Sequence, residues 1–161
     1  MEAVKAPLRT LWEAIPAPVR GLIRTMRPKQ WAKNGFVYAG ILFDQQILDA
    51  EPFARVTLAF VLLCLSSSTI YIINDLIDIE RDRLHPRKRL RPLPSGQLPV
   101  SWAISAAIVL PLLALGISLP FSPPLTLVLL GYLALHIAYS FWLKNIVLID
   151  VFAIAAGFIL R

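Results

Sequence analysis

The sequence predicts an all-α membrane protein, a bundle of helices that cross the bilayer several times. Its 161 residues are 57% hydrophobic and only 16% charged, and the mean hydropathy is +0.67, which is too apolar for an ordinary soluble domain. Apolar segments of roughly the length that a bilayer-spanning helix needs recur along the chain. Short polar connections separate them, and the basic residues gather in alternate connections.

The positive charge points to a membrane surface. The formal net charge is +6, but the basic residues lie beside apolar segments and do not alternate with exposed aromatic residues. The expected partners are therefore a lipid bilayer and anionic substrates, and no nucleic acid. The single cysteine, Cys64, lies inside an apolar run, so no internal disulfide can form.

Five apolar segments make up the predicted bundle. A cytoplasmic tail over 1–18 leads into a short amphipathic helix at about 19–26, with which the membrane domain over 19–161 begins. The segments cover 34–48, 53–73, 99–119, 124–143 and 146–161. The first segment is the weakest candidate, whereas the second can cross the bilayer at a rise of about 1.5 Å per residue. Pro99 and Pro124 suit helix starts, and Pro111 is expected to kink the third segment.

The basic residues also predict the orientation. Lys29 and Lys33 precede the first segment, the basic stretch 81–91 follows the second, and Lys144 follows the fourth. These are alternate connections, and positive charge in short connections prefers the cytoplasmic side. We therefore expect a multi-pass protein of the cell membrane with its N-terminus and the stretch 75–91 in the cytoplasm.

Three aspartates lie where the second segment reaches the cytoplasm. If this helix continues through NDLIDIERD, then Asp75, Asp78 and Asp82 fall at i, i+3 and i+7 on one narrow stripe, with Asn74 beside it. Glu80 points elsewhere. Carboxylates on one stripe repel one another unless a cation joins them. Oxygen ligands of this kind suit Mg2+, which is held by a few carboxylates, several waters and substrate phosphates.

Two simpler interpretations compete with a metal site. Acidic residues at a helix end often form a solvated face, and the basic residues that follow can set the topology or bind anionic lipid headgroups. Neither explains why acids and bases adjoin at the end of a membrane helix, whereas a magnesium-bound diphosphate needs both. The adjoining bases are Arg83, Arg87, Lys88, Arg89 and Arg91.

The pattern N-D-x-x-D-x-x-x-D at 74–82 resembles the first aspartate-rich motif of the UbiA superfamily of intramembrane prenyltransferases. As in that family, it follows the second membrane helix. The resemblance implies a UbiA-type bundle in which a second aspartate-rich motif completes the site. No such motif occurs within the 161 residues, so we expect an N-terminal half with about five transmembrane helices, inactive by itself, whose C-terminal half is missing.

Three further blocks are similar to the decaprenyl-phosphate phosphoribosyltransferase branch: RPKQWAKN at 27–34, DRLHPRKRLRPLPSG at 82–96 and YSFWLKNIVLID at 139–150. The resemblance implies magnesium-dependent transfer of a 5-phosphoribosyl group from phosphoribosyl diphosphate (PRPP) to a polyprenyl phosphate, for cell-wall arabinan synthesis. The implied catalytic and metal-binding residues are Asp75, Asp78 and Asp82. The implied substrate-binding residues are Asn74, Lys29, Lys33, Asn34, Arg83, Lys88, Arg89, Arg91, Tyr139 and Lys144. Without the resemblance, interfacial anchoring is the simpler interpretation of Lys29 and Lys33, and it is an equal alternative for Tyr139 and Lys144.

Two other functions stay open from the sequence. The same aspartates suit a true prenyltransferase, which alkylates an aromatic or isoprenoid acceptor with a prenyl diphosphate; the block at 27–34 argues against it. The other alternative is a non-catalytic membrane fragment whose basic stretch binds anionic lipid. Lipid anchoring needs no metal, so a binding assay with and without magnesium separates these alternatives.

The orientation is testable by cysteine accessibility in intact cells. In His85→Cys the new thiol should react with an impermeant reagent only after lysis, and in Ser122→Cys it should react in intact cells, because the basic residues place position 85 inside and position 122 outside. The unmodified chain, whose Cys64 lies in an apolar run, is the control. Reaction of the Ser122→Cys thiol only after lysis would refute the orientation.

Overall fold

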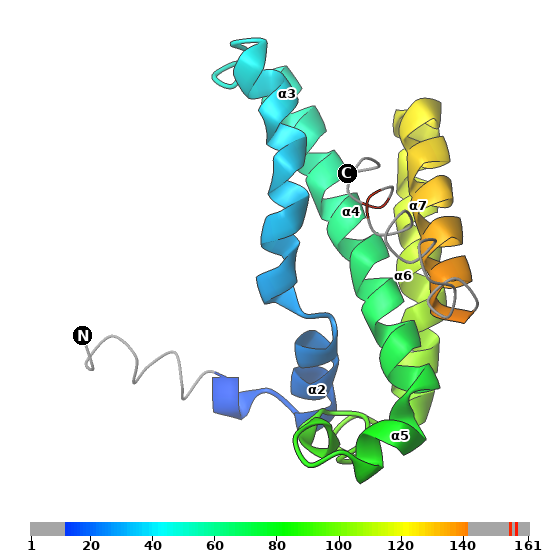
Figure 1. Cartoon of the computed structure of the whole chain (residues 1–161). Coiled ribbons are helices and arrows are strands. Elements are labelled where there is room, and N and C mark those ends of the chain that lie inside the picture. The colour runs from blue at the N-terminus through cyan, green and yellow to red at the C-terminus, as the bar shows by residue number, and fades with distance from the viewer. Residues whose placement is uncertain (1–11, 142–154, 156, 158–161) are drawn as a thin grey trace.

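The computed structural model describes residues 12–141, 155 and 157, and these residues form helices and turns without a strand. Figure 1 shows their arrangement. The short helix predicted near 19–26 is present as α2. The elements are α2 (Ala17–Thr25), η1 (Pro28–Val37), α3 (Tyr38–Phe43), α4 (Ala50–Ile77), α5 (Ile79–Leu84), η2 (Lys88–Leu90), α6 (Val100–Phe121) and α7 (Pro123–Phe141).

Among the described residues, three helices are long and apolar enough to cross a membrane: α4, α6 and α7. Even α7, with 19 described residues, extends about 28 Å at the α-helical rise, close to the hydrocarbon thickness of a bilayer. They correspond to the predicted segments 53–73, 99–119 and 124–143, so the all-α membrane class is confirmed. The helix α6 continues through Pro111 and Pro120.

The first predicted segment differs from the expectation. It is not one α-helix over 34–48 but a ten-residue 3-10 helix, η1, followed by the six-residue α3. A 3-10 helix rises about 2.0 Å per residue, so the two together extend about 29 Å although they contain only 16 residues. Figure 1 shows this pair running along α4. The fifth predicted segment lies outside the described residues, except for 155 and 157.

Polar side chains hold η1 against α4. The amide Nδ2 of Asn34 donates to the Sγ of Cys64 and to the Oγ of Ser67, each at 3.3 Å. The indole Nε1 of Trp31 donates to the Oγ of Ser68 at 3.1 Å. Small residues let two membrane helices approach closely, and interhelical hydrogen bonds then fix their register. These contacts position η1 beside the C-terminal half of α4.

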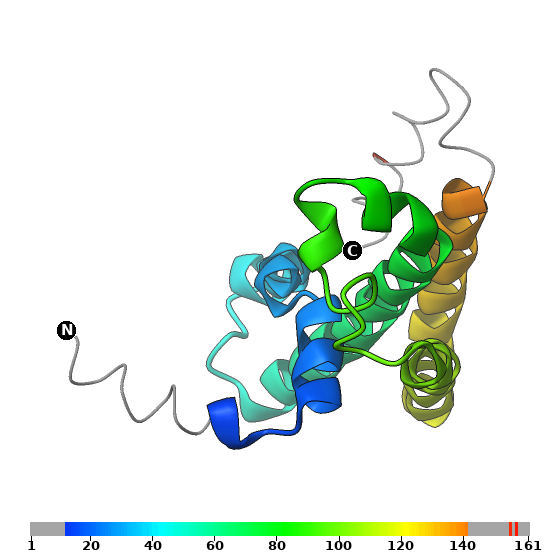
Figure 2. The ribbon, with the colours of Figure 1, turned by 90° about the horizontal axis from the view of Figure 1, so that it is seen from below.

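A cluster of apolar side chains packs together at the end of the bundle where α2, α5 and the α5–α6 connection meet, the lower end in Figure 1. Ile72 of α4, Leu93 and Leu98 of the α5–α6 connection and Ala103 of α6 are buried together. A Cβ added to Gly21 of α2 would lie 3.1 Å from the Cβ of Leu98, so glycine allows α2 to press against this connection. Figure 2 shows α2 and the connection lying across the lower end of the long helices.

The outward faces of α6 and α7 expose large apolar side chains. Leu112, Leu119 and Leu127 are 60–70% exposed. A soluble monomer rarely exposes an apolar surface of this extent. Lipid is the natural environment of such a surface. The lipid-facing side is thus set by α6 and α7, and the polar residues gather at the lower end, where α2, α5 and the connection meet.

Candidate active site

The site lies where α4 gives way to α5 (Figure 1). Asp78 interrupts the helix for one residue, with φ −90° and ψ 4°. The turns on both sides continue, because the amide of Asp78 donates to the carbonyl of Asn74 at 3.0 Å and the amide of Asp82 donates to the carbonyl of Asp78 at 2.8 Å. The three aspartates therefore stay close to the predicted helical spacing, but not on one uninterrupted helix.

Asp75 is only 3% exposed and is held by two arginines. The Nη2 of Arg27 donates to the Oδ1 of Asp75 at 2.6 Å, and the Nη1 of Arg91 lies 3.3 Å from the same oxygen. Arg27 precedes η1 and Arg91 follows η2, so residues far apart in the sequence converge on one carboxylate. A buried carboxylate is costly unless cations compensate it.

Asp82 is fully buried and anchors the basic connection. The Nη1 of Arg91 donates to its Oδ2 at 2.6 Å, and the Nζ of Lys88 lies 3.6 Å from its Oδ1. Among the described residues, that Oδ1 has no hydrogen-bond partner. Asp78 is turned more to the surface and pairs with Arg81 at 2.6 Å. The aspartates thus have different environments: two are buried against bases, and one is partly open.

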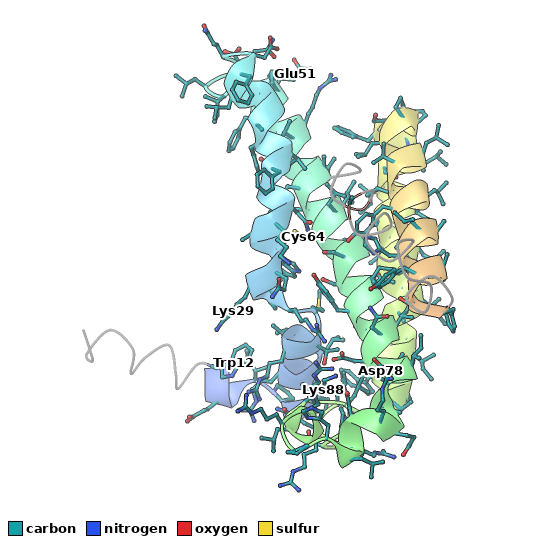
Figure 3. All side chains as sticks on the ribbon, viewed as in Figure 1. Trp12, Lys29, Glu51, Cys64, Asp78 and Lys88 are labelled. Atoms are coloured by element: carbon teal, nitrogen blue, oxygen red, sulfur yellow. The ribbon has the colours of Figure 1, made fainter. Side chains whose placement is uncertain are left out.

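These side chains line a polar pocket of about 220 Å³. Four parts of the chain contribute: the start of η1, the end of α4, the basic connection and the end of α7. Figure 3 shows Asp78 and Lys88 at the same end of the bundle, with Glu51 at the opposite end. The lining residues are Arg27, Asn74, Asp75, Asp78, Lys88, Arg91, Tyr139 and Ser140.

A second pocket of about 330 Å³ lies beside Arg27. It is lined by Arg24, Arg27, Pro28, Lys29 and Gln30, without an acidic residue. Arg27 lines both pockets. One pocket therefore combines carboxylates with bases, and the adjoining pocket offers only cationic and neutral groups.

Comparison with known proteins identifies the family. Residues 35–161 match the model of the UbiA prenyltransferase family. The chain belongs to the UbiA family. The resemblance inferred from the aspartate motif is therefore confirmed. UbiA-type prenyltransferases generally depend on a divalent metal ion.

Curated relatives carry the name decaprenyl-phosphate phosphoribosyltransferase. The chain is 40% identical to the one from Mycolicibacterium smegmatis over 151 residues, which cover 89% of the chain and 46% of that relative. It is 39% identical to the one from Corynebacterium glutamicum, over 88% of the chain and 44% of the relative. The chain is 34% identical to the one from Mycobacterium tuberculosis, over 89% of the chain and 49% of that relative. The chain thus spans about half the length of these UbiA relatives.

The structure gathers only some of the residues that the sequence indicated. Asn74, Asp75, Asp78, Lys88, Arg91 and Tyr139 line the acidic pocket, and Lys29 lines the basic one. Lys33 and Arg89 are exposed and line neither pocket. Asn34 is buried between η1 and α4, and Arg83 pairs with Glu80 at 2.6 Å. Asp82 does not line either pocket, and Lys144 lies outside the described residues.

Sequence reasoning missed Arg27, Arg24 and Ser140. Arg27 opens the block 27–34, which carries the resemblance, but within this block the resemblance implies substrate contacts at Lys29, Lys33 and Asn34. Its backbone has φ 54° and ψ 60°, a left-handed conformation that is uncommon for a residue with a Cβ. No sequence pattern signals this conformation. Its position directly before Pro28, at the start of the basic block 27–34, was the available signal.

The lining residues fit a metal that shares its ligands with a substrate. The described part of the chain contains no group of three His, Cys, Asp or Glu residues arranged to hold a metal ion. Asn74, Asp75 and Asp78 nevertheless offer oxygen atoms to one polar pocket. Mg2+ commonly takes one or two carboxylates and completes its octahedron with waters and substrate phosphates. Lys88 and Arg91 line the same pocket, so its lining combines metal-binding oxygens with bases of the kind that pair with phosphate.

The burial of Asp82 predicts a structural role. Asp82→Asn should lower the free energy of unfolding in detergent micelles by about 2 kcal/mol, because Arg91 and Lys88 lose a buried countercharge but are themselves partly exposed. The matched control is Glu80→Gln, which removes an exposed carboxylate paired with Arg83 and should cost less than about 1 kcal/mol. Equal losses in both variants would contradict the anchoring role.

Proposed function

We propose that this chain forms part of a membrane phosphoribosyltransferase. The reaction transfers the 5-phosphoribosyl group of PRPP to a polyprenyl phosphate such as decaprenyl phosphate, for cell-wall arabinan precursors. The curated relatives named decaprenyl-phosphate phosphoribosyltransferase support this proposal, and the chain spans about half their length. The lipid substrate and the apolar helices are consistent with a location in the cell membrane, with the pocket on the cytoplasmic side.

The observation that carries the donor assignment is the pair of pockets that share Arg27. PRPP has two separate anionic groups, a diphosphate at one end of the ribose and a single phosphate at the other. The acidic pocket combines metal-binding oxygens with bases, which suits the diphosphate. The adjoining pocket, with Arg24 and Lys29 and no acid, suits the 5-phosphate. A prenyl diphosphate has no second anion and would leave Arg24 and Lys29 without an anionic partner in this pocket.

Magnesium is the metal that we assign to the acidic pocket. Asn74, Asp75 and Asp78 would hold it, and Asp82 is the further carboxylate that the motif predicts. Hard oxygen ligands together with phosphate oxygens favour Mg2+ over softer metals. When bound, the ion would supply charge neutralisation for the departing diphosphate.

The chain's own residues then bind and orient the substrates. Lys88 and Arg91 neutralise diphosphate oxygens, and Lys29 with Arg24 retains the 5-phosphate. Tyr139 at the end of α7 lines the same pocket and orients the donor. A polyprenyl phosphate that enters sideways from the bilayer attacks the anomeric carbon of the ribose, and the bond to the diphosphate breaks. Its phosphate is already a competent nucleophile, so positioning and charge neutralisation suffice without a protein nucleophile.

A prenyltransferase is the second candidate, because the matching family model is named for prenyl transfer. A prenyl diphosphate presents the same leaving group, so the aspartates suit both donors. The remaining alternative is an anionic-lipid-binding membrane fragment, for which magnesium is unnecessary. Lys33, Asn34, Arg83 and Arg89 line neither pocket, and Lys144 lies outside the described residues; all five stay predicted substrate contacts.

Direct binding by the purified chain in lipid nanodiscs tests the donor. PRPP should bind with magnesium and lose most of its affinity without it. Lys29→Ala should weaken the binding of PRPP about tenfold, as expected for one charge-assisted phosphate contact, and leave the affinity for inorganic pyrophosphate unchanged. Arg55→Ala removes an exposed base at the opposite end, next to Glu51, and should change neither ligand.

Geranylgeranyl diphosphate is the competing ligand in the same assay. If it binds as tightly as PRPP in the presence of magnesium, and Lys29→Ala weakens neither, the phosphoribosyl assignment is wrong and prenyl transfer takes its place. Binding of anionic lipid alone, independent of magnesium, would support the non-catalytic alternative.

A further inference from the structure

Arg27 pairs with the carboxylate oxygen of Asp75 that a metal ion in the acidic pocket would also use. Its Nη2 lies 2.6 Å from the Oδ1 of Asp75, and its guanidinium carbon lies 4.9 Å from the centre of the Tyr71 ring. The carboxylate is 4% exposed and the arginine side chain 35%. Because the arginine is the more exposed partner, it can change partner while the buried carboxylate keeps its place.

The two buried carboxylates are more than neutralised by the surrounding bases without a divalent ion. The buried carboxylates of Asp75 and Asp82 are contacted by three cations, Arg27, Lys88 and Arg91, which leaves this group with one net positive charge. Adding a divalent cation alone would raise the local positive charge further at a poorly hydrated membrane boundary. Adding the cation together with a diphosphate would offset it.

We propose that Arg27 is an exchange residue that makes metal binding depend on diphosphate. Arg27 and the metal compete for the Oδ1 of Asp75. When the metal and a diphosphate bind together, the metal takes this oxygen and Arg27 moves to a phosphate oxygen. The proposal rests on the proposed function only in that the acidic pocket binds a diphosphate. Arg27 lines both pockets, so its side chain reaches phosphate on either side without a change in the fold.

The exchange predicts opposite effects on two ligands. A competitor lowers the apparent affinity of the metal by the fraction of Asp75 that it occupies, so removing Arg27 should tighten the binding of metal alone. The same removal deletes a charge-assisted contact to phosphate, so it should weaken the binding of diphosphate with metal. A residue that only supports the fold would weaken both ligands.

The experiment uses the full 161-residue chain in nanodiscs. Electron paramagnetic resonance measures the affinity of the chain for Mn2+ alone. Calorimetry measures its affinity for inorganic pyrophosphate in the presence of saturating Mg2+. Arg27→Gln should bind Mn2+ about tenfold more tightly and pyrophosphate about tenfold more weakly than the unmodified chain. Arg27→Lys, which keeps the charge but loses the planar fork, should shift both affinities in the same directions by less. Arg55→Gln, which breaks a pair of the same 2.6 Å length, should shift neither.

Weaker or unchanged Mn2+ binding in Arg27→Gln would overturn the exchange. If Arg27→Gln does not fold, Arg27→Lys decides, and an absence of opposite shifts there overturns it as well. Pyrophosphate separates this proposal from the donor assignment. If the unmodified chain binds pyrophosphate but not PRPP, only the phosphoribosyl assignment fails. If it binds neither ligand, both proposals fail.

Discussion

Two carboxylates are buried at the end of a membrane helix, and the rest of the lower end is arranged to neutralise them. Asp75 and Asp82 are 3% and 0% exposed. Leaving either without a countercharge would be strongly unfavourable in this environment. The cations come from the start of η1 and from the connection after α5, so α2, η1 and that connection must fold onto the end of α4. The apolar cluster around Ile72 and Leu98 supplies the packing that holds them there.

Much of this fold follows from length and hydropathy. The helices α4, α6 and α7 correspond to apolar segments that are long enough to span a bilayer, and the charged residues fall where the helices reach water. The 3-10 helix η1 could not be predicted, because the usual length criterion assumes the α-helical rise. With a rise of about 2.0 Å per residue, a shorter segment reaches nearly as far. The hydrogen bonds of Asn34 and Trp31 to α4 are tertiary contacts without a local signal.

The sequence predicted which types of residue make up the site, but not which acidic and basic side chains pair with each other. Helical spacing indicated that Asp75, Asp78 and Asp82 lie close together. It did not reveal that Asp82 is fully buried and does not line the pocket, or that Asp75 pairs with Arg27, 48 positions before it. A diphosphate is common to PRPP and prenyl donors, so the aspartates alone select neither. In the proposed function, the neighbouring pocket at Arg24 and Lys29 distinguishes the two donors.

The central claim is that the carboxylates at the end of α4 hold a divalent ion together with a diphosphate. Electron–nuclear double resonance on Mn2+ with pyrophosphate, bound to the chain in nanodiscs, tests this directly by detecting phosphorus coordinated to the metal. The account predicts a strong phosphorus coupling that is lost in Asp75→Asn and kept in Glu51→Gln, which changes an acid at the other end of α4 (Figure 3). An identical coupling in Asp75→Asn, or none in the unmodified chain, would contradict it.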